Sequence, residues 1–173
     1  MKNKNEPSQF SLIQTKGSLD WAYPAFILAS TAATMDKEVT LFFSFYGLEC
    51  LLKDTRRLRV SPIGNPAMRI KSPVGPAWLK AIDWNIVLPS IIWTLPGAER
   101  LATWGFNKQL EQQGQVSIEA LREICLELGV KMTACQMTVD LMGYEASDFI
   151  EGVEFAGAAT YFAQTAESQN LLI

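Results

Sequence analysis

The stretch at residues 38–46 constrains the fold of this chain most strongly. Its sequence, Glu-Val-Thr-Leu-Phe-Phe-Ser-Phe-Tyr, is rich in β-branched and aromatic residues and is almost continuously apolar. A strand with this composition is typically covered on both faces, as in the centre of a parallel sheet. Gly47 then breaks the strand. The stretch therefore predicts a central strand in an α/β protein.

The rest of the chain alternates between strand and helix patterns. Further strands are predicted at residues 8–15, 130–135 and 153–155, and the longer helices at residues 19–35, 98–112, 118–128 and 157–166. Alternation of this kind indicates βαβ units and a mostly parallel sheet. We expect one α/β domain over residues 8–166, with flexible tails at 1–7 and 167–173.

An insertion at residues 61–112 interrupts the alternation. It begins with a loop rich in Pro and Gly and continues into a tryptophan-rich stretch, residues 77–104, which has no charge between Asp83 and Glu99. This uncharged window is too short for a spanning helix, and prolines interrupt it. Two interpretations remain, an oligomer interface or a peripheral contact with a membrane. The oligomer interface is the favoured one.

Several classes of function are excluded by composition and motif. The chain has no histidine, which removes Ser-His-Asp triads, Cys-His dyads and most transition-metal sites. It has neither G-x-G-x-x-G nor a P-loop, so nucleotide binding is not supported. A net charge of −3 gives no electrostatic footprint for nucleic acid. We expect no metal and no cofactor.

The cysteines and the start of the chain indicate the compartment. The three cysteines are an odd number, widely spaced and without a C-x-x-C motif, which favours a reducing environment over a disulfide framework. Residues 1–7 are polar and lack the apolar segment of a secretory signal. These features predict a cytoplasmic protein.

Cys135 is the leading candidate for chemistry. It follows a short apolar strand and precedes a helical turn that ends at Gly143. In an open parallel sheet, groups just past the carboxyl ends of strands face the ligand crevice. A thiol beside a helix N-terminus is also favoured as the thiolate. The alternative is that Cys135 fills the core as a small apolar residue. Cys50 is a weaker candidate at a second strand end, and Cys125 belongs to the core face of a helix.

A second junction, at Lys16, Gly17 and Ser18, follows the first predicted strand. If its strand neighbours the Cys135 strand, the backbone N–H groups of both junctions point into one pocket. Such a pocket, with Gln136 and Met137 on the cysteine side, suits a small anion. Lys16 could add positive charge. A thiol beside an anion site fits sulfur transfer or redox chemistry at sulfur.

Six segments together resemble one known family. They are Lys16-Gly17-Ser18-Leu19-Asp20, Phe42-Phe43-Ser44-Phe45-Tyr46-Gly47-Leu48, Gly64-Asn65-Pro66, Leu95-Pro96-Gly97, residues 134–143 around Cys135, and Gly152-Val153-Glu154-Phe155-Ala156-Gly157. Over residues 8–163 the chain resembles the DsrE/DsrF/DrsH-like family, especially its branch associated with sulfur oxidation and labelled peroxiredoxin-like. The Cys135 segment is the most specific part of the resemblance.

The resemblance implies a flavodoxin-like, doubly wound, mostly parallel sheet of about five strands, usually in homo-oligomers. It also implies a cysteine that carries sulfane sulfur as a persulfide, or binds thiosulfate, and passes sulfur to a small TusA-like relay protein. Cys135 matches that cysteine. The second cysteine that some relatives use is not evident, and no peroxidatic T-x-x-C is present.

Three hypotheses for function follow. The first is a sulfur carrier or sulfurtransferase in which the Cys135 thiolate attacks a sulfane sulfur donor. The second is a non-catalytic oligomeric scaffold or membrane-associated subunit that works through residues 77–104. The third is a thiol-redox sensor, which would be oxidised reversibly without taking up sulfur. The reactivity of Cys135 separates the first from the second.

Overall fold

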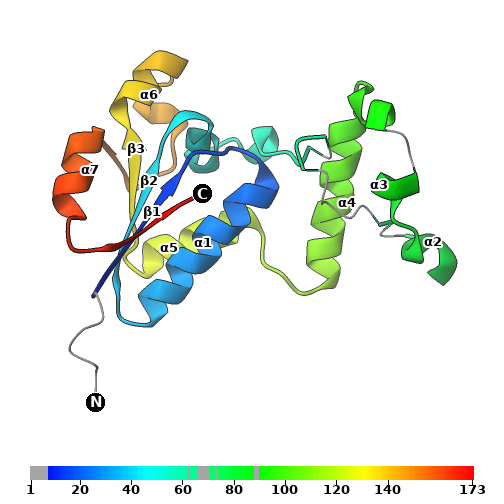
Figure 1. The fold of residues 1–173 in the computed structure, drawn as a ribbon, viewed down its shortest axis with the longest axis horizontal. Helices are drawn as coiled ribbons and strands as arrows, with labels where there is room; N and C mark the ends of the chain where they lie inside the picture. Colours follow the sequence, from blue (N-terminus) through cyan, green and yellow to red (C-terminus); the bar gives the residue numbers. More distant parts are fainter. Residues whose placement is uncertain (1–7, 62, 66–70, 73, 88–89) are drawn as a thin grey trace. The chain divides into compact units, whose positions relative to one another are not determined.

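The structure is a computed structural model that describes residues 8–61, 63–65, 71–72, 74–87 and 90–173. The chain divides into two compact units (Figure 1). The first, here called the sheet unit, combines the chain up to Leu58 with Ile118–Ile173, and the second, the helical unit, is Arg59–Ser117. The helical unit covers the insertion expected at residues 61–112. The expectation that one domain over residues 8–166 carries this insertion stays a prediction.

The sheet unit contains a parallel sheet in the order β4-β3-β2-β1-β5. Its strands are β1 (Gln9–Gln14), β2 (Glu38–Phe43), β3 (Lys131–Cys135), β4 (Val153–Ala156) and β5 (Gln169–Leu172). β2 lies at the centre, and its residues 39–43 are all buried. The predicted α/β class and the parallel sheet of five strands are confirmed.

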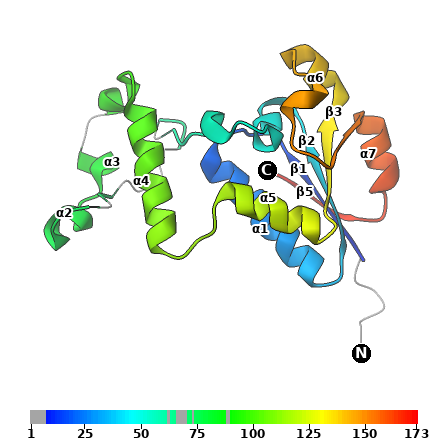
Figure 2. The ribbon, with the colours of Figure 1, turned by 180° about the vertical axis from the view of Figure 1, so that it is seen from behind.

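Helices cover both faces of the sheet, so the fold is doubly wound (Figure 2). On one face, α1 (Leu19–Thr34) and α5 (Ile118–Glu127) pack together, and Phe26 of α1 stacks on Phe43 of β2 with 5.8 Å between ring centroids. On the opposite face, α7 (Ala158–Gln164) stacks Tyr161 on Phe42 at 4.7 Å. Phe42 and Phe43, which follow one another in β2, thus point to opposite faces of the sheet, as the pleat of a strand requires.

The predicted flexible tail at residues 167–173 is wrong for most of its length. Gln169–Leu172 forms β5, which pairs in parallel with β1 from Phe10↔Gln169 to Ile13↔Leu172. Thr15 N donates to Ile173 O at 2.8 Å and extends the ladder. β5 is exposed along its length, so its sequence carries little apolar periodicity. Main-chain hydrogen bonds to β1 hold it, and a residue pattern does not reveal such bonds.

The helical unit contains α2 (Ala77–Ala81), α3 (Trp84–Val87), the 3-10 helix η3 (Ser90–Thr94) and α4 (Ala98–Gln112). Many of its large apolar side chains are exposed, among them Trp78, Ile86, Val87, Ile91, Leu101 and Trp104. Among the described residues, none of the helices has the length and apolar character needed to cross a bilayer.

Two glycines let the loops after β1 and β2 cross at the carboxyl edge of the sheet. The loop after β2 is the 3-10 helix η1 (Phe45–Leu51). A Cβ built on Gly17 would overlap Tyr46 O, and one built on Gly47 would overlap Gln14 O. Gly47 N also donates to Thr15 O at 3.0 Å. The crossing therefore requires backbone in contact with backbone, which only glycine permits.

We expect Gly17→Ala to lower the free energy of unfolding by about 3 kcal/mol, because the added methyl group forces two main chains apart. Gly105→Ala is the matched control. A Cβ at Gly105 meets nothing within 4 Å and lies within α4, so this change should alter stability by less than about 1 kcal/mol. Chemical denaturation of both variants measures the difference. Equal stabilities would contradict the close crossing.

Candidate functional site

Cys135 lies at the carboxyl end of β3, where the strand runs directly into α6 (Gln136–Met142). It is the N-cap residue of α6 and pairs with Ala156 of β4 in the sheet. Its side chain points to the same face as Phe42 and is 3% exposed. Tyr161, Phe42 and Ile13 pack around it. The sequence placed Cys135 at a strand-to-helix junction, and the structure has it there.

Uncharged hydrogen-bond donors surround the Cys135 thiol. Burial by itself raises the pKa of Cys135, but hydrogen bonds from the hydroxyl and backbone N–H of Thr138, the hydroxyl of Ser44 and the backbone N–H of Met137 outweigh it. The resulting pKa of Cys135 is lower than that of an ordinary thiol. These donors favour the thiolate, the form that acts as a nucleophile.

The side chains of Ser44 and Thr138 join two elements above the sheet. Ser44 directly follows β2, and Thr138 lies in the first turn of α6 and is fully buried. Their hydroxyl oxygens are 3.2 Å apart, and Phe45 N donates to Thr138 Oγ1 at 3.4 Å. Phe45 adopts a positive φ of 48°, which is uncommon for a bulky residue. The backbone after β2 is thus turned toward α6.

An aromatic layer closes the other side of the thiol. Tyr161 of α7 is 1% exposed and stacks on Phe42, next to Cys135. Its hydroxyl donates to Ser11 Oγ at 3.0 Å, so the buried phenol keeps a partner. The thiol therefore has polar donors on one side and packed aromatic rings on the other.

Gln136 and Met137 directly follow Cys135 at the start of α6, and their expected part in binding the substrate stays a prediction. The side chain of Gln136 is exposed and donates to Asp140 Oδ1 at 2.8 Å. The side chain of Met137 is 65% exposed, and its contribution to the thiol is its backbone N–H. Both residues lie where a molecule approaching α6 would meet them.

The sequence predicts that Lys16, Gly17 and Ser18 share an anion pocket with Cys135 if the strands before them, β1 and β3, are neighbours. These two strands are not neighbours. β2 lies between β1 and β3. Gly17 packs under Tyr46, Ser18 Oγ donates to Asp20 at 2.7 Å, and Lys16 Nζ lies 3.2 Å from the centre of the Trp21 ring. The residues that occupy the neighbouring strand end are those of η1, with Ser44 before it.

Sequence reasoning missed Ser44 and Thr138. Ser44 interrupts an otherwise apolar run just before Gly47, and Thr138 follows Cys135 by three residues. Both are local signals. They could have been connected only by knowing that β2 and β3 are neighbours in the sheet.

The other two cysteines are fully buried, and the pKa of each thiol is raised. Cys50 is fully buried and donates to Lys16 O at 3.7 Å, and burial raises the pKa of its thiol to about 12. Cys125 is also fully buried and donates to Phe26 O at 3.4 Å, and burial raises its pKa to about 11. Neither forms a thiolate at neutral pH.

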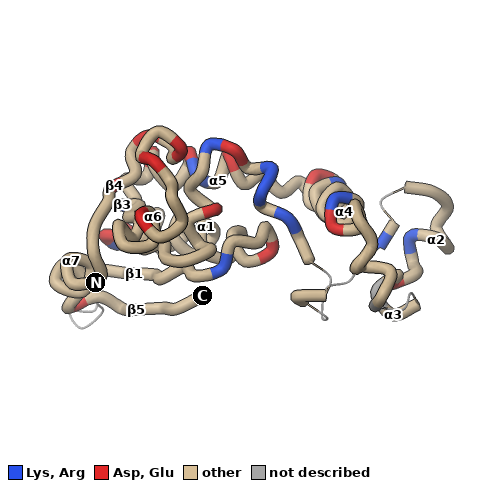
Figure 3. Tube along the Cα trace, turned by 90° about the horizontal axis from the view of Figure 1, so that it is seen from above, with Lys and Arg blue, Asp and Glu red and all other residues tan. Residues whose placement is uncertain are grey.

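Charges near α6 are mainly acidic. α6 contains one acidic residue, Asp140, and Glu145 and Asp148 follow in the next segment (Figure 3). Within the described residues, no cluster of three or more His, Cys, Asp and Glu side chains could hold a metal ion.

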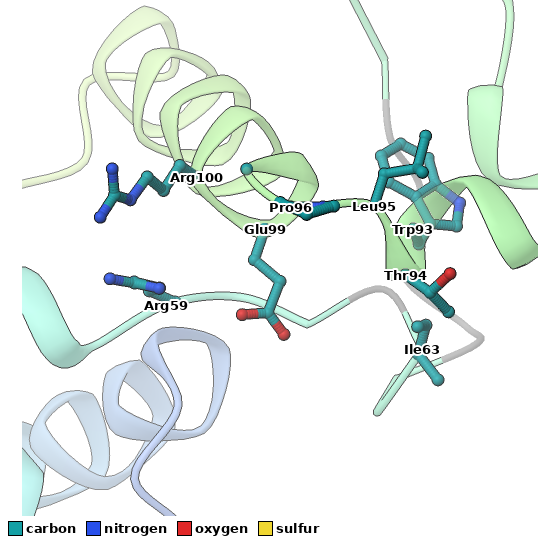
Figure 4. A pocket seen from close by; sticks show the side chains of 9 residues that line it. Arg59, Ile63, Trp93, Thr94, Leu95, Pro96, Glu99 and Arg100 are labelled. Carbon is teal, nitrogen blue, oxygen red and sulfur yellow. The ribbon is translucent and has the colours of Figure 1, made fainter.

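A separate hollow of about 750 Å³ lies within the helical unit (Figure 4). Arg59, Glu99 and Arg100 line it on one side, and Ile63, Trp93 and Leu95 lie on the other. It contains no cysteine, and Arg59 has a partner of its own. It adds nothing to the chemistry of the thiol.

Comparison with known proteins gives three results. The sequence profile of the DsrE/DsrF/DrsH-like family matches residues 6–173. The "Sulfur carrier protein DsrE2" of Allochromatium vinosum is 48% identical over 163 residues, which is 94% of this chain and 96% of that protein. The "Uncharacterized protein YrkE" of Bacillus subtilis is 27% identical, over 94% of this chain and 95% of that protein.

Among solved structures, the ychN protein of E. coli aligns with a TM-score of 0.48 and 13% identity. The alignment covers 95% of this chain and 97% of that one.

We expect a single thiol to react in the native protein. Iodoacetamide at neutral pH should modify Cys135, because only its pKa is lowered, while Cys50 and Cys125 should react only after denaturation. Peptide mapping by mass spectrometry identifies the labelled site. Cys135→Ser should leave the native protein unlabelled, and rapid native labelling of Cys50 would contradict the description of the site.

Proposed function

The chain belongs to the DsrE/DsrF/DrsH-like family, and we propose that it is a sulfur carrier in which Cys135 holds the sulfur. The observation that carries the proposal is the buried Cys135 thiol with its pKa lowered by uncharged donors. A relative that is 48% identical along almost the whole chain is itself a sulfur carrier protein by name. The chemistry of the site and the kinship point to the same activity.

Sulfur loading proceeds by thiolate attack. The Cys135 thiolate attacks the sulfane sulfur of a donor, a new S–S bond forms, and the S–S bond of the donor breaks. The leaving group departs with the electron pair. A persulfide donor leaves a thiolate and gives a Cys135 persulfide, whereas tetrathionate leaves thiosulfate and gives a Cys135 thiosulfonate. No oxidant, metal or cofactor is needed.

The residues around Cys135 have separate tasks in this step. The donors at Thr138, Ser44 and Met137 hold the negative charge of the thiolate before attack. The exposed side chains of Gln136 and Met137 meet the donor. Lys16, Gly17 and Ser18, which the sequence placed at the anion site, have no part in this step; Gly17 serves the loop crossing instead.

Delivery of sulfur requires a partner, and we assign this role to a TusA-like relay protein in the cytoplasm. Cys135 is almost fully covered in the isolated chain, so a partner has to come close to α6. Met137 and Leu141 are exposed on one side of α6, four residues apart, and offer apolar contact area beside the thiol. Asp140 of α6, with Glu145 and Asp148 in the segment after it, would favour a basic partner surface.

The helical unit has a different role as an interface between copies of the chain. Its exposed apolar side chains include Trp78, Ile86, Val87 and Ile91, and a second copy of the chain would remove them from water. Six Lys and Arg against three Asp and Glu give residues 59–117 a net charge of +3, and the remaining nine Lys and Arg against 15 Asp and Glu give the sheet unit −6. The opposite charges of the two units favour association between copies.

Tetrathionate treatment tests the loading of Cys135. We expect the intact mass of the native wild-type protein to rise by one thiosulfonate group, and reductant to remove it. Cys135→Ser should gain nothing, whereas Cys125→Ala should load like the wild type because Cys125 is buried away from the site. An adduct that persists in Cys135→Ser would sink the proposal.

Charge substitutions on the helical unit test its role. The double variant Trp78→Glu, Ile86→Glu should raise the dissociation constant for self-association at least tenfold, because charges replace exposed apolar contacts. Sedimentation velocity measures this constant. Lys108→Glu, on a residue ion-paired to Glu111, is a control for added negative charge. If the double variant assembles normally but no longer floats with anionic vesicles, the surface is instead a membrane contact.

A further inference from the structure

Thr138 lies three residues after Cys135, in the first turn of α6. The chain has no histidine, so an imidazole cannot take the proton of Cys135 or hold its thiolate. Thr138 is fully buried in the first turn of α6, the helix that Cys135 caps, and its hydroxyl and backbone N–H lower the pKa of Cys135. Among the groups around the thiol, Thr138 makes the largest favourable contribution to the thiolate.

The hydrogen bonds to Thr138 set the direction of its hydroxyl. Phe45 N donates to Thr138 Oγ1 at 3.4 Å and occupies an acceptor position on that oxygen. Ser44 Oγ is 3.2 Å away and also bonds to Cys135. Because the hydroxyl hydrogen of Thr138 cannot lie toward the amide of Phe45, it is left to point toward Ser44 or the sulfur. A full negative charge on the sulfur attracts both hydroxyl hydrogens.

Other ionisable groups on the elements around Cys135 do not replace this arrangement. They have partners elsewhere: Asp140 on α6 accepts from Gln136, Tyr161 on α7 donates to Ser11, Glu49 on η1 accepts from Tyr144, and Lys131 on β3 donates to Glu38. Glu154 on β4 is exposed to solvent. None of these groups contributes to the shift of the Cys135 thiol.

We propose that Thr138 is the positioning residue that keeps Cys135 as a thiolate ready to attack, through a hydroxyl that Phe45 N orients and Ser44 assists. The role deepens the proposed function and rests on it, because a thiolate is what attacks sulfane sulfur. The positive φ of Phe45 is consistent with this role. That backbone conformation aims an N–H group at α6.

The pH dependence of alkylation tests the role of Thr138 without any sulfur donor. The rate of iodoacetamide labelling of Cys135 is measured across pH in the wild type, Thr138→Val and Thr138→Ser. In Thr138→Val the buried thiolate loses a hydroxyl donor, so we expect the pKa of Cys135 to rise by about one. This corresponds to roughly a tenfold loss of thiolate at neutral pH. Thr138→Ser restores the hydroxyl and should keep the wild-type profile.

Two further variants keep the test decisive. Thr40→Val makes the same change on a buried threonine of β2 and should leave the profile unchanged. Ser44→Ala removes the second hydroxyl and should also move the profile upward, even if Thr138→Val does not fold. An unchanged profile in Ser44→Ala and in folded Thr138→Val would overturn the role of the hydroxyl pair.

Loading with tetrathionate separates this inference from the proposed function. If the inference holds, Thr138→Val loads slowly at neutral pH and recovers the wild-type rate at high pH. A wild type that takes up no sulfur, with the alkylation profile still shifted in Thr138→Val, would refute the sulfur carrier and leave the role of Thr138 intact. A wild type that takes up sulfur, with no shift of the alkylation profile in Thr138→Val or Ser44→Ala, would refute the role of Thr138 and leave the sulfur carrier intact.

Discussion

The burial of the Cys135 sulfur beside uncharged hydrogen-bond donors is the constraint on which the proposed chemistry depends. Burial alone disfavours a thiolate, and the chain has no histidine to form an ion pair with it. Hydrogen bonds from uncharged groups have to compensate, and they come from two elements, the start of α6 and the residue that follows β2. Ser44 can join Thr138 and Met137 at the thiol only if β2 and β3 are neighbours, which the sheet order ensures.

The crossing of the loops after β1 and β2 supports this arrangement from beneath. Gly17 and Gly47 allow the two main chains to touch, and this contact sets the course of η1. Ser44 and Phe45, at the start of η1, can then reach Thr138. The residues after β1, which looked from the sequence like part of an anion site, are therefore structural supports for the donors at Cys135. A change there should affect the thiol through the position of η1.

The sequence was sufficient for the features that depend on local pattern. The apolar stretch at residues 38–46 identified the central strand, and the junction before Gln136 identified Cys135. It was insufficient where the outcome depends on which strands lie side by side. The anion pocket with Gly17 and Ser18 assumed neighbouring strands, and β2 separates them. β5 escaped notice because main-chain bonds to β1 hold an exposed and weakly patterned segment. Ser44 and Thr138 are distant in the chain, and only the fold joins them.

Transfer of sulfur from the loaded protein tests the central claim most directly. The wild type would be loaded with isotopically labelled sulfane sulfur, freed of donor and mixed with a TusA-like protein, and the label would then be located by peptide mass spectrometry. We predict that the label starts on the peptide containing Cys135 and moves to a cysteine of the acceptor, and that Cys135→Ser neither gains nor passes label. Label that resides on Cys50 or Cys125, or that stays on Cys135 whatever thiol acceptor is offered, would contradict a sulfur carrier that works through Cys135.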